Sequence, residues 1–424
     1  MYRASRGTQD ILPQEQDYWR YVQRTAEELC RRFGYQRIDT PVFESADLFV
    51  RGVGDATDIV IKEMYTFEDR GGEQLTLRPE GTAPVCRAYL ERGMASLPQP
   101  VRLHYFCPIF RYERPQAGRY RQHHQFGIEA IGDAGPAIDA EVIQLGWLLV
   151  ATLGLKGASL KVNTIGDPSC RPTYLQELRS YYQARLASLC PDCQARYHRN
   201  PLRLLDCKQQ TCQPHILEAP RSADHLCPDC QRHWTSLQQY LEELDLPFQV
   251  EPRLVRGLDY YARTVFEVQP QEEGSQSTLV GGGRYDGLIQ ALGGRPTPGI
   301  GFGAGLERLV LNLRSQQVPV PAVIPRPVVV AHQGKEADPR GAQVATQLRQ
   351  HGISVLVAPS SRSLRAQMRY ASSMNARFVV ILGEAELARG VLTVRDMDQA
   401  HQQELTLEQA TSLLSLAAGP ATGQ

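Results

Sequence analysis

A short polar hairpin near residue 115 restricts the folds open to this chain more than any other feature. Phe110-Arg111-Tyr112-Glu113 and the run 119–129 contain β-forming residues, and they flank a loop with Pro115 and Gly118. Their faces carry arginines, carboxylates and amides instead of aliphatic side chains. Such charges are too costly to bury without partners, and arginine forks match phosphate and carboxylate oxygens. The pattern therefore predicts a sheet that holds a ligand with both anionic and cationic groups.

The composition is that of a soluble globular protein. The 424 residues predict two or three domains, and the 46 basic and 46 acidic residues give no global argument for nucleic-acid binding. No apolar run approaches the roughly 20 residues that span a bilayer, and the N-terminus lacks the apolar region of a secretory signal. We therefore expect a cytoplasmic protein without a membrane partner. In that reducing compartment, metal binding or plain burial is favoured over disulfides for the ten cysteines.

The order of strand and helix patterns predicts an α+β protein with two domains. Residues 1–325 contain antiparallel strand patterns, and a cysteine-rich helical insertion interrupts them at about 170–245. Within this domain, residues 57–68 are expected to form a short strand. Prolines between 319 and 327 mark a stiff linker. Beyond it, strands and helices alternate over 326–424, which predicts a compact α/β domain.

Four further motifs carry candidate chemistry, and each has a plainer structural interpretation. Glu80 in Leu77-Arg78-Pro79-Glu80-Gly81-Thr82 either starts a helix or accepts a ligand ammonium. Arg256-Gly257-Leu258-Asp259-Tyr260-Tyr261 is either a packing segment with a surface ion pair or part of a site. Gly281-Gly282-Gly283 permits close approach of a ligand, although a loop or bulge accounts for it equally well.

The fourth motif, Gly299 to Leu309, alternates glycines along a strand and ends with Arg308. Its glycine spacing and its place late in the domain do not fit a dinucleotide-binding fingerprint. Alternating glycines instead leave a flat surface for a planar ligand, on which Arg308 could stack.

These five motifs, in this order, resemble the histidyl-tRNA synthetase family of class II aminoacyl-tRNA synthetases. The resemblance runs from Arg6-Gly7-Thr8-Gln9-Asp10 to the C-terminal domain. It implies a class II antiparallel-sheet catalytic domain with a helical insertion and a C-terminal anticodon-binding domain. It also implies ATP-dependent ligation of L-histidine to tRNA(His) through a histidyl-adenylate, with release of AMP and pyrophosphate. Residues 14–44 resemble the motif that forms the family's homodimer interface.

The resemblance also assigns expected roles to residues. Arg111 and Arg256 would act catalytically by holding the α-phosphate and the histidine carboxylate. The other expected histidine ligands are Glu80, Thr82, Gln125, Glu129, Tyr260, Tyr261 and Tyr285, with Glu129 and Tyr261 on the imidazole nitrogens. The other expected ATP ligands are Glu113, Arg119, His123 and Arg308, with Mg²⁺ on the phosphates. Arg114 and Gln116 would meet the tRNA acceptor end.

His123 departs from the family pattern, which usually has a phenylalanine stacked on adenine at this position. Imidazole is smaller and protonates near neutral pH, so we expect His123 to weaken ATP binding modestly, and most at low pH.

The cysteine-rich insertion contains Cys-Pro-Asp-Cys twice, at 190–193 and 227–230. Paired Cys-x-x-Cys knuckles are typical of zinc sites. The spacing predicts a structural zinc on Cys190, Cys193, Cys227 and Cys230, with Cys207 and Cys212 as competing ligands. The family resemblance does not require zinc for catalysis.

Two other functions compete with the synthetase. One is the family's non-catalytic paralogue, a regulatory subunit of histidine biosynthesis, which as a rule lacks the anticodon-binding domain and several signature residues. The other is an RNA-binding scaffold without chemistry. The chain keeps Arg111, Arg256, Tyr261 and Arg308 together with a full C-terminal domain, which favours the enzyme.

Overall fold

The computed structural model describes residues 2–55, 57–116, 118–270, 278–322 and 325–418. The chain divides into two units, Met1–Pro321 and Ala322–Gln424. No helix in the described ranges is long and apolar enough to cross a membrane.

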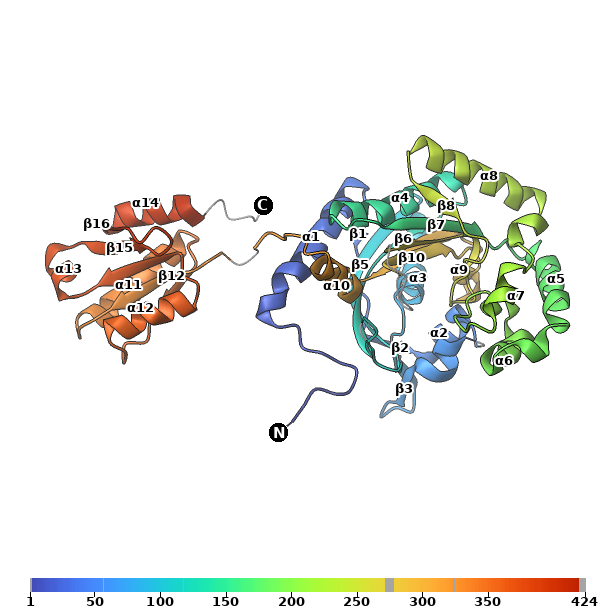
Figure 1. The fold of residues 1–424 in the computed structure, drawn as a ribbon, viewed down its shortest axis with the longest axis horizontal. Helices are drawn as coiled ribbons and strands as arrows, with labels where there is room; N and C mark the ends of the chain where they lie inside the picture. The colour runs from blue at the N-terminus through green and yellow to red at the C-terminus, as the bar shows by residue number, and fades with distance from the viewer. Residues whose placement is uncertain (1, 56, 117, 271–277, 323–324, 419–424) are drawn as a thin grey trace. The chain divides into compact units, whose positions relative to one another are not determined.

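An eight-stranded sheet forms the centre of the first unit, in the order β1-β5-β6-β11-β10-β9-β7-β8 (Figure 1). The strands are β1 (Gln36–Arg37), β5 (Val101–Phe110), β6 (Gln122–Ile131), β7 (Ser159–Thr164), β8 (Phe248–Val250), β9 (Ala262–Gln269), β10 (Val280–Arg284) and β11 (Gly299–Gly305). All neighbours pair antiparallel except the two edge pairs, β1 with β5 and β7 with β8. The predicted polar hairpin is β5–β6, and the predicted α+β fold with an antiparallel sheet is confirmed.

Helices cover both faces of this sheet. The main apolar core lies between the sheet and α1 (Gln16–Arg32), α4 (Pro136–Thr152), α8 (Pro228–Glu243) and α10 (Leu306–Ser315). A second core on the other face includes α3 (Thr82–Glu91) and α9 (Leu288–Ala291). Successive side chains of a strand point to opposite faces. Even-numbered residues of β6, such as Phe126 and Ile128, therefore fill the main core, and the odd-numbered Gln125 and Glu129 point to the α3 face.

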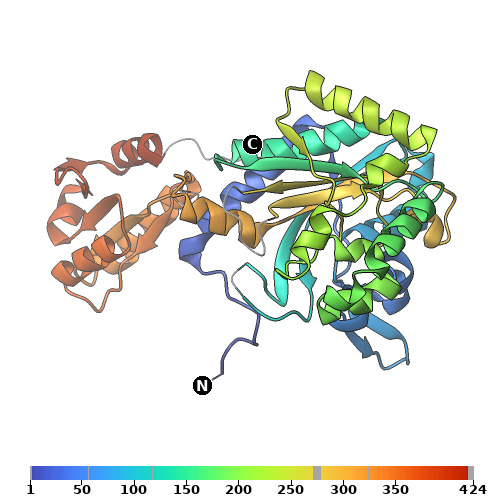
Figure 2. The same ribbon diagram turned by 45° about the vertical axis from the view of Figure 1, so that its right-hand side comes forward.

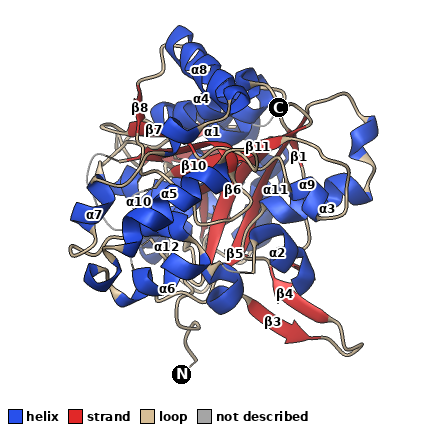
Figure 3. Ribbon diagram, turned by 90° about the vertical axis from the view of Figure 1, so that its right-hand side faces the viewer, coloured by secondary structure: helices blue, strands red, loops and turns tan. Residues whose placement is uncertain are grey.

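A small three-stranded sheet, β2-β4-β3, projects from this unit (Figure 3). It consists of β2 (Phe43–Ser45), β3 (Tyr65–Glu68) and β4 (Gln74–Leu77), with α2 (Ala46–Val53) beside it. The strand predicted at 57–68 is wrong in its first half, because Ile59–Glu63 form a turn of π-helix. The Met64 amide bonds to the Ile59 carbonyl, and Ile59 packs against Phe49 and Val53. The apolar run that resembles a strand is therefore a helical turn.

The insertion is mostly helical, as predicted, and has its own apolar core (green in Figure 2). Its helices before α8 are α5 (Arg171–Gln183), α6 (Pro191–Arg199) and α7 (Gln213–Leu217). Short 3-10 turns of the unit are η1 (Pro13–Glu15), η3 (Met94–Ser96), η4 (Leu186–Ser188), η5 (Pro201–Leu204) and η6 (Ser222–His225). The insertion's core also includes Leu254, Val255 and Tyr261, so it continues into the segment that precedes β9.

The second unit is a five-stranded sheet in the order β13-β12-β14-β15-β16, with an apolar core on each face. The strands are β12 (Val328–His332), β13 (Val355–Val357), β14 (Phe378–Leu382), β15 (Leu392–Asp396) and β16 (Gln402–Leu405). The helices are α11 (Ala337–Gln350), α12 (Leu364–Ser373), α13 (Glu384–Arg389) and α14 (Leu407–Ala418). Strand β12 pairs in parallel with β13 and β14, whereas β15 pairs antiparallel with β14 and β16.

Candidate functional site

A polar cavity of about 230 Å³ lies on the α3 face of the large sheet. The motifs found in the sequence meet there, although up to 228 residues separate them along the chain. The predicted residues that line it are Glu80, Thr82, Arg111, Glu113, Arg119, His123, Gln125, Arg256, Tyr260, Tyr261 and Arg308. Glu129 and Tyr285 are buried beside it, and Arg114 and Gln116 are exposed in the hairpin loop outside it. The structure thus brings together the residues expected to bind histidine and ATP.

Two of the lining arginines bond to neutral backbone groups. The Arg111 Nε donates to the Pro79 carbonyl at 2.7 Å, and Arg308 donates to the carbonyls of Gly118 at 3.2 Å and Thr278 at 2.9 Å. Burial lowers the pKa of both guanidinium groups, and Arg119 and Arg111 lower that of Arg308 further. Positive charges that disfavour one another in a partly dry cavity favour a bound polyanion.

The other two arginines pair with acids. Arg119 forms an ion pair with Glu113 inside the hairpin, and Arg256 forms one with Glu267 of β9. Glu267 is only 8% exposed, and its second oxygen accepts a hydrogen bond from the Thr278 hydroxyl at 2.8 Å. The sequence analysis missed Glu267, because a carboxylate in a strand has no local signal for a partner eleven residues away.

Glu80 comes just before Gly81, the N-cap residue of helix α3, and it also lines the cavity. Its two oxygens accept the backbone amides of Thr82 and Ala83, both at 2.7 Å. The predicted helix start is therefore confirmed, although Glu80 lies ahead of the first turn and not in it. The Tyr260 hydroxyl lies 3.4 Å from the same carboxylate. Burial raises the pKa of Glu80, and these amide bonds oppose the rise. Its role toward a ligand ammonium stays a prediction.

Glu129 lies beneath the cavity floor and has three hydroxyl partners. Its Oε1 accepts from Thr82 at 2.8 Å and from Tyr105 at 3.2 Å, and its Oε2 accepts from Tyr285 at 2.6 Å. The carboxyl is fully buried, and burial raises its pKa to about 8 although the hydroxyl bonds oppose the rise. The Oε2 atom has a single hydroxyl partner, so one acceptor position of this carboxyl is left for a further donor. Tyr105 was missed, since an aromatic residue in a strand is more often plain core.

The alternating glycines of β11 make room for side chains of the neighbouring strand as well as for the cavity. A Cβ on Gly301 would lie 2.0 Å from the Glu129 Oε2, and a Cβ on Gly303 would lie 2.1 Å from the Gln125 Nε2. The cleared space is thus partly filled by side chains of the neighbouring strand β6. Gly303 and Gly305 line the cavity, and the flat surface for a planar ligand stays a prediction. The pattern of a single strand does not reveal which side chains cross it from the next strand. The triple glycine 281–283 belongs to β10 and is not a loop.

Glu307 is a further missed residue, and it lies next to Arg308 in the first turn of α10. It lines the cavity, and its oxygens accept the His124 backbone amide at 2.9 Å. The Glu307 carboxylate thereby fixes strand β6 beside the ATP-side arginines.

His123 lines the cavity on the side of Arg111 and Arg308. Burial and then these two guanidinium groups lower the pKa of His123 to about 3. The ring is therefore neutral throughout the range pH 6–8, and the expectation of a weakening that grows at low pH is wrong. The sequence shows the imidazole but not the two cations beside it.

We expect His123→Phe to lower the KM for ATP by about two- to tenfold, since a better aromatic stack contributes about 0.5–1.5 kcal/mol. Because the imidazole is already neutral, the ratio of variant to wild-type KM should be the same at pH 6 and pH 8. Steady-state kinetics at both pH values measure it. A KM that is unchanged or higher at both would contradict the stacking role.

The pKa of Glu129 also predicts a pH dependence of folding. Its folded pKa of about 8 exceeds the ordinary 4.5, so the folded state holds a proton that the unfolded state releases between these values. Stability must then fall as pH rises from about 5 to 8. Glu129→Gln removes this loss, and its Tm relative to wild type should increase between pH 5.5 and pH 8.5. Thermal unfolding at both pH values tests this, and parallel shifts of both proteins would refute it.

The cysteines of the insertion form two clusters, and the predicted zinc set is wrong. Cys190 and Cys193 lie with the competing ligands Cys207 and Cys212, whereas Cys227 and Cys230 lie with Asp167 and Cys170. Both Cys-Pro-Asp-Cys motifs cap helices, α6 and α8, and the fold separates those helix starts. Spacing identifies a knuckle but not its partner knuckle.

Comparison with known proteins gives consistent matches. Residues 7–309 match the family profile described as histidyl-tRNA synthetase, and residues 327–415 match an anticodon binding domain. A histidine–tRNA ligase of Dehalococcoides mccartyi is 55% identical over 96% of this chain and 98% of its own length. One from Desulforamulus reducens is 49% identical over 95% and 96%. The crystal structure of an apo histidyl-tRNA synthetase from S. aureus is similar with a TM-score of 0.82, at 36% identity, over 98% of this chain and all of that one.

Proposed function

This chain belongs to the histidyl-tRNA synthetase family, and we propose that the cavity on its large sheet is where histidine and ATP react. The chain is an enzyme that ligates histidine to tRNA(His) at the expense of ATP. The single observation that carries the placement of the reaction is the convergence of four arginines and the Glu80–Tyr260–Tyr261 group on one cavity.

The regulatory-subunit alternative is not favoured. The chain matches histidine–tRNA ligases over nearly its whole length and includes the anticodon-binding domain. That domain supports tRNA as a substrate. We propose that the exposed Arg114 and Gln116 of the hairpin loop meet the tRNA acceptor end.

In the proposed reaction, a carboxylate oxygen of histidine attacks the α-phosphorus of ATP, and the bond to pyrophosphate breaks. Negative charge builds on the phosphoryl oxygens, so catalysis depends on positioning and electrostatics. Arg111 comes from the hairpin and Arg256 from the segment before β9, and both line the cavity. They would bind the α-phosphate and the histidine carboxylate. Arg308 would stack on adenine beside His123, Glu113 would contact the adenine end, and Arg119 would bind the outer phosphates.

Magnesium would arrive with the substrate as the Mg²⁺ complex of ATP. The carboxylates of Glu113 and Glu307 line the cavity, and hard oxygen donors of this kind suit the ion. The bound ion would neutralise charge on the phosphates. Glu113 pairs with Arg119 and Glu307 accepts the His124 amide, so most ligands of the ion would be phosphate oxygens and water.

The amino-acid end of the cavity would select histidine by hydrogen bonding. Glu80, Thr82 and Gln125 would hold the α-ammonium, and Tyr261 and Glu129 would take the two ring nitrogens. Tyr260 lines the cavity and Tyr285 holds Glu129. A site that hydrogen-bonds polar ligand atoms leaves buried groups unpaired with any other side chain, and such sites discriminate by about 10⁴–10⁵.

We also propose that the enzyme acts as a cytoplasmic homodimer. The segment that resembles the family's dimer motif includes Val42 and Phe43, which are 40% and 53% exposed. Apolar side chains exposed in this way favour a protein interface.

Histidine-dependent exchange of ³²P-pyrophosphate into ATP tests the proposed site. Each amino acid is offered separately, first to wild type and then to Arg111→Gln. Exchange with histidine alone, lost in the variant while its thermal stability is retained, supports the placement. Exchange that survives in Arg111→Gln at the wild-type rate would place the chemistry elsewhere.

A further inference from the structure

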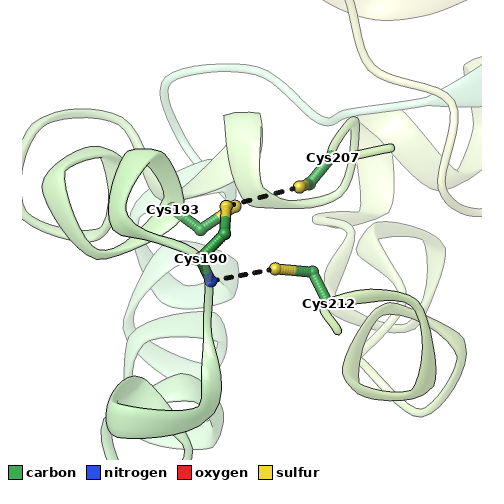
Figure 4. Close-up of side chains that lie close together, drawn as sticks. All are labelled: Cys190, Cys193, Cys207 and Cys212. Atoms are coloured by element: carbon green, nitrogen blue, oxygen red, sulfur yellow. Dashed lines mark hydrogen bonds between the residues drawn. The ribbon is translucent and has the colours of Figure 1, made fainter. Parts of the chain in front are cut away.

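We propose that Cys190, Cys193, Cys207 and Cys212 bind one structural zinc ion in the insertion. Figure 4 shows the four thiols gathered around a common centre, with Cys190 and Cys193 from the start of α6 on one side and Cys207 and Cys212 from the segment before α7 on the other. This proposal does not depend on the site of histidine activation.

The sulfur positions fit a tetrahedral ion. All four Sγ atoms lie within 4.8 Å of one another, and the Cys190 and Cys207 Sγ atoms are 3.8 Å apart. Zinc–thiolate bonds of about 2.3 Å in a tetrahedron place sulfurs about 3.8 Å apart. A disulfide needs sulfurs at about 2.05 Å and would join only two of the four.

The surroundings of the thiols are also those of a closed structural site. Cys193, Cys207 and Cys212 are buried, and Cys190 is half-buried. The Cys190 amide donates to the Cys212 sulfur at 3.3 Å, and the Gln209 amide donates to the Cys207 sulfur at 3.4 Å. Backbone amides aimed at sulfur orient metal ligands and stabilise thiolates. Four protein ligands leave no open position, which is typical of structural and not catalytic zinc.

The second cluster, Asp167 with Cys170, Cys227 and Cys230, contains a carboxylate in place of a fourth thiol. Its non-cysteine member, Asp167, already forms an ion pair with Arg263 at 3.1 Å and accepts the Ser169 amide at 2.9 Å. Its carboxylate is thus engaged by protein donors. The four-cysteine cluster contains no carboxylate, so none of its four ligands is held in an ion pair of this kind.

The position of the four-cysteine cluster suggests what the ion does. Two contacts start from the stretch of chain between Cys193 and Cys207. Asn200 donates to Asp259 at 2.6 Å, and Arg196 of α6 pairs with Asp58 at 3.1 Å. Tyr261 packs in the same apolar core as Cys193 and its partners. Zinc would fasten the part of the insertion that supports the segment carrying Arg256 and Tyr261. Loss of the zinc should therefore raise the KM for histidine. That expectation rests on the proposed function, whereas the expected metal content does not.

Metal analysis of the full chain, produced without a metal-binding tag and kept reduced, tests the site. We expect at least one zinc per wild-type chain and the loss of one equivalent in Cys207→Ser/Cys212→Ser. The matched control Cys30→Ser/Cys86→Ser removes two buried thiols outside both clusters and should keep the wild-type content. Cys227→Ser/Cys230→Ser should keep the zinc lost by the first variant. Zinc far below one equivalent in wild type, or full zinc in the first variant, overturns the proposal.

A measurement on wild-type protein covers the case in which the variant does not fold. Replacement of zinc by Co²⁺ should give the intense sulfur-to-cobalt charge-transfer bands of a tetrathiolate. Alkylation followed by mass spectrometry should show the four thiols protected together until a chelator is added. Absence of the cobalt bands, or a disulfide between Cys190 and Cys207 in the reduced preparation, overturns the proposal.

Discussion

Arg256→Gln is expected to lower the rate of histidine-dependent pyrophosphate exchange by about 10³-fold, the loss typical of removing one preorganised donor to a developing anion. The effect should fall mainly on kcat, because the guanidinium would stabilise charge that develops on the α-phosphate only in the transition state. Single-turnover formation of the adenylate, followed by quenched flow, measures this step directly.

Two control variants separate catalysis from folding. Arg256→Gln leaves the buried Glu267 without its cation, which destabilises the protein by itself. The double variant with Glu267→Gln removes that unpaired charge and should recover stability but not activity. Arg253→Gln changes the same residue type three positions away, where Arg253 pairs with Glu251 at 2.9 Å outside the cavity, and it should keep activity within about twofold. Exchange by Arg256→Gln within tenfold of wild type would remove Arg256 from the mechanism.

Glu129→Gln is expected to lower kcat/KM for histidine by about tenfold, since burial keeps this carboxyl largely neutral near pH 7 and a hydrogen bond between neutral groups contributes about 0.5–1.5 kcal/mol. The amide keeps the size of the carboxyl and one acceptor oxygen, so the change acts through hydrogen bonding and not through a cavity. The KM for ATP should stay within about twofold of wild type. If kcat/KM fell equally for histidine and for ATP, the substitution would have disturbed the cavity floor as a whole and not one contact with histidine.

Tyr285→Phe provides the comparison for this prediction. The Tyr285 hydroxyl donates to Glu129 at 2.6 Å but does not line the cavity. Its removal should cost less than Glu129→Gln, because the carboxyl keeps its bonds to Thr82 and Tyr105. A larger loss in Tyr285→Phe than in Glu129→Gln would place the recognition on the phenol.

The fold was largely predictable because its elements have strong local patterns. The β5–β6 hairpin has a turn between β-forming runs, and the second unit alternates strand and helix patterns after a proline-rich linker. Prediction failed at Ile59–Glu63, where an apolar run that suits a strand forms a π-helical turn packed on α2. Local sequence does not decide between these outcomes when the run is short.

The charged residues that line the cavity were singled out from the sequence, and the residues that hold them in place were missed. Arg111, Arg256 and Arg308 stand out in the sequence because each is a charged residue within a segment rich in glycine, tyrosine or other β-forming residues. Glu267, Glu307 and Tyr105 have no such signal, and each acts by holding another residue in place.

Sequence by itself determined which residue types are present and in what order, and from these the α+β architecture and the chemistry of the five motifs follow. Tertiary structure alone decided which distant groups face one another. It put Cys190 and Cys193 with Cys207 and Cys212, put two guanidinium groups beside His123, and buried Glu129 among hydroxyls. The physical reason is that pKa values, ion pairs and metal geometry depend on distances of a few ångströms. Residues far apart along the chain set those distances, and no local pattern encodes them.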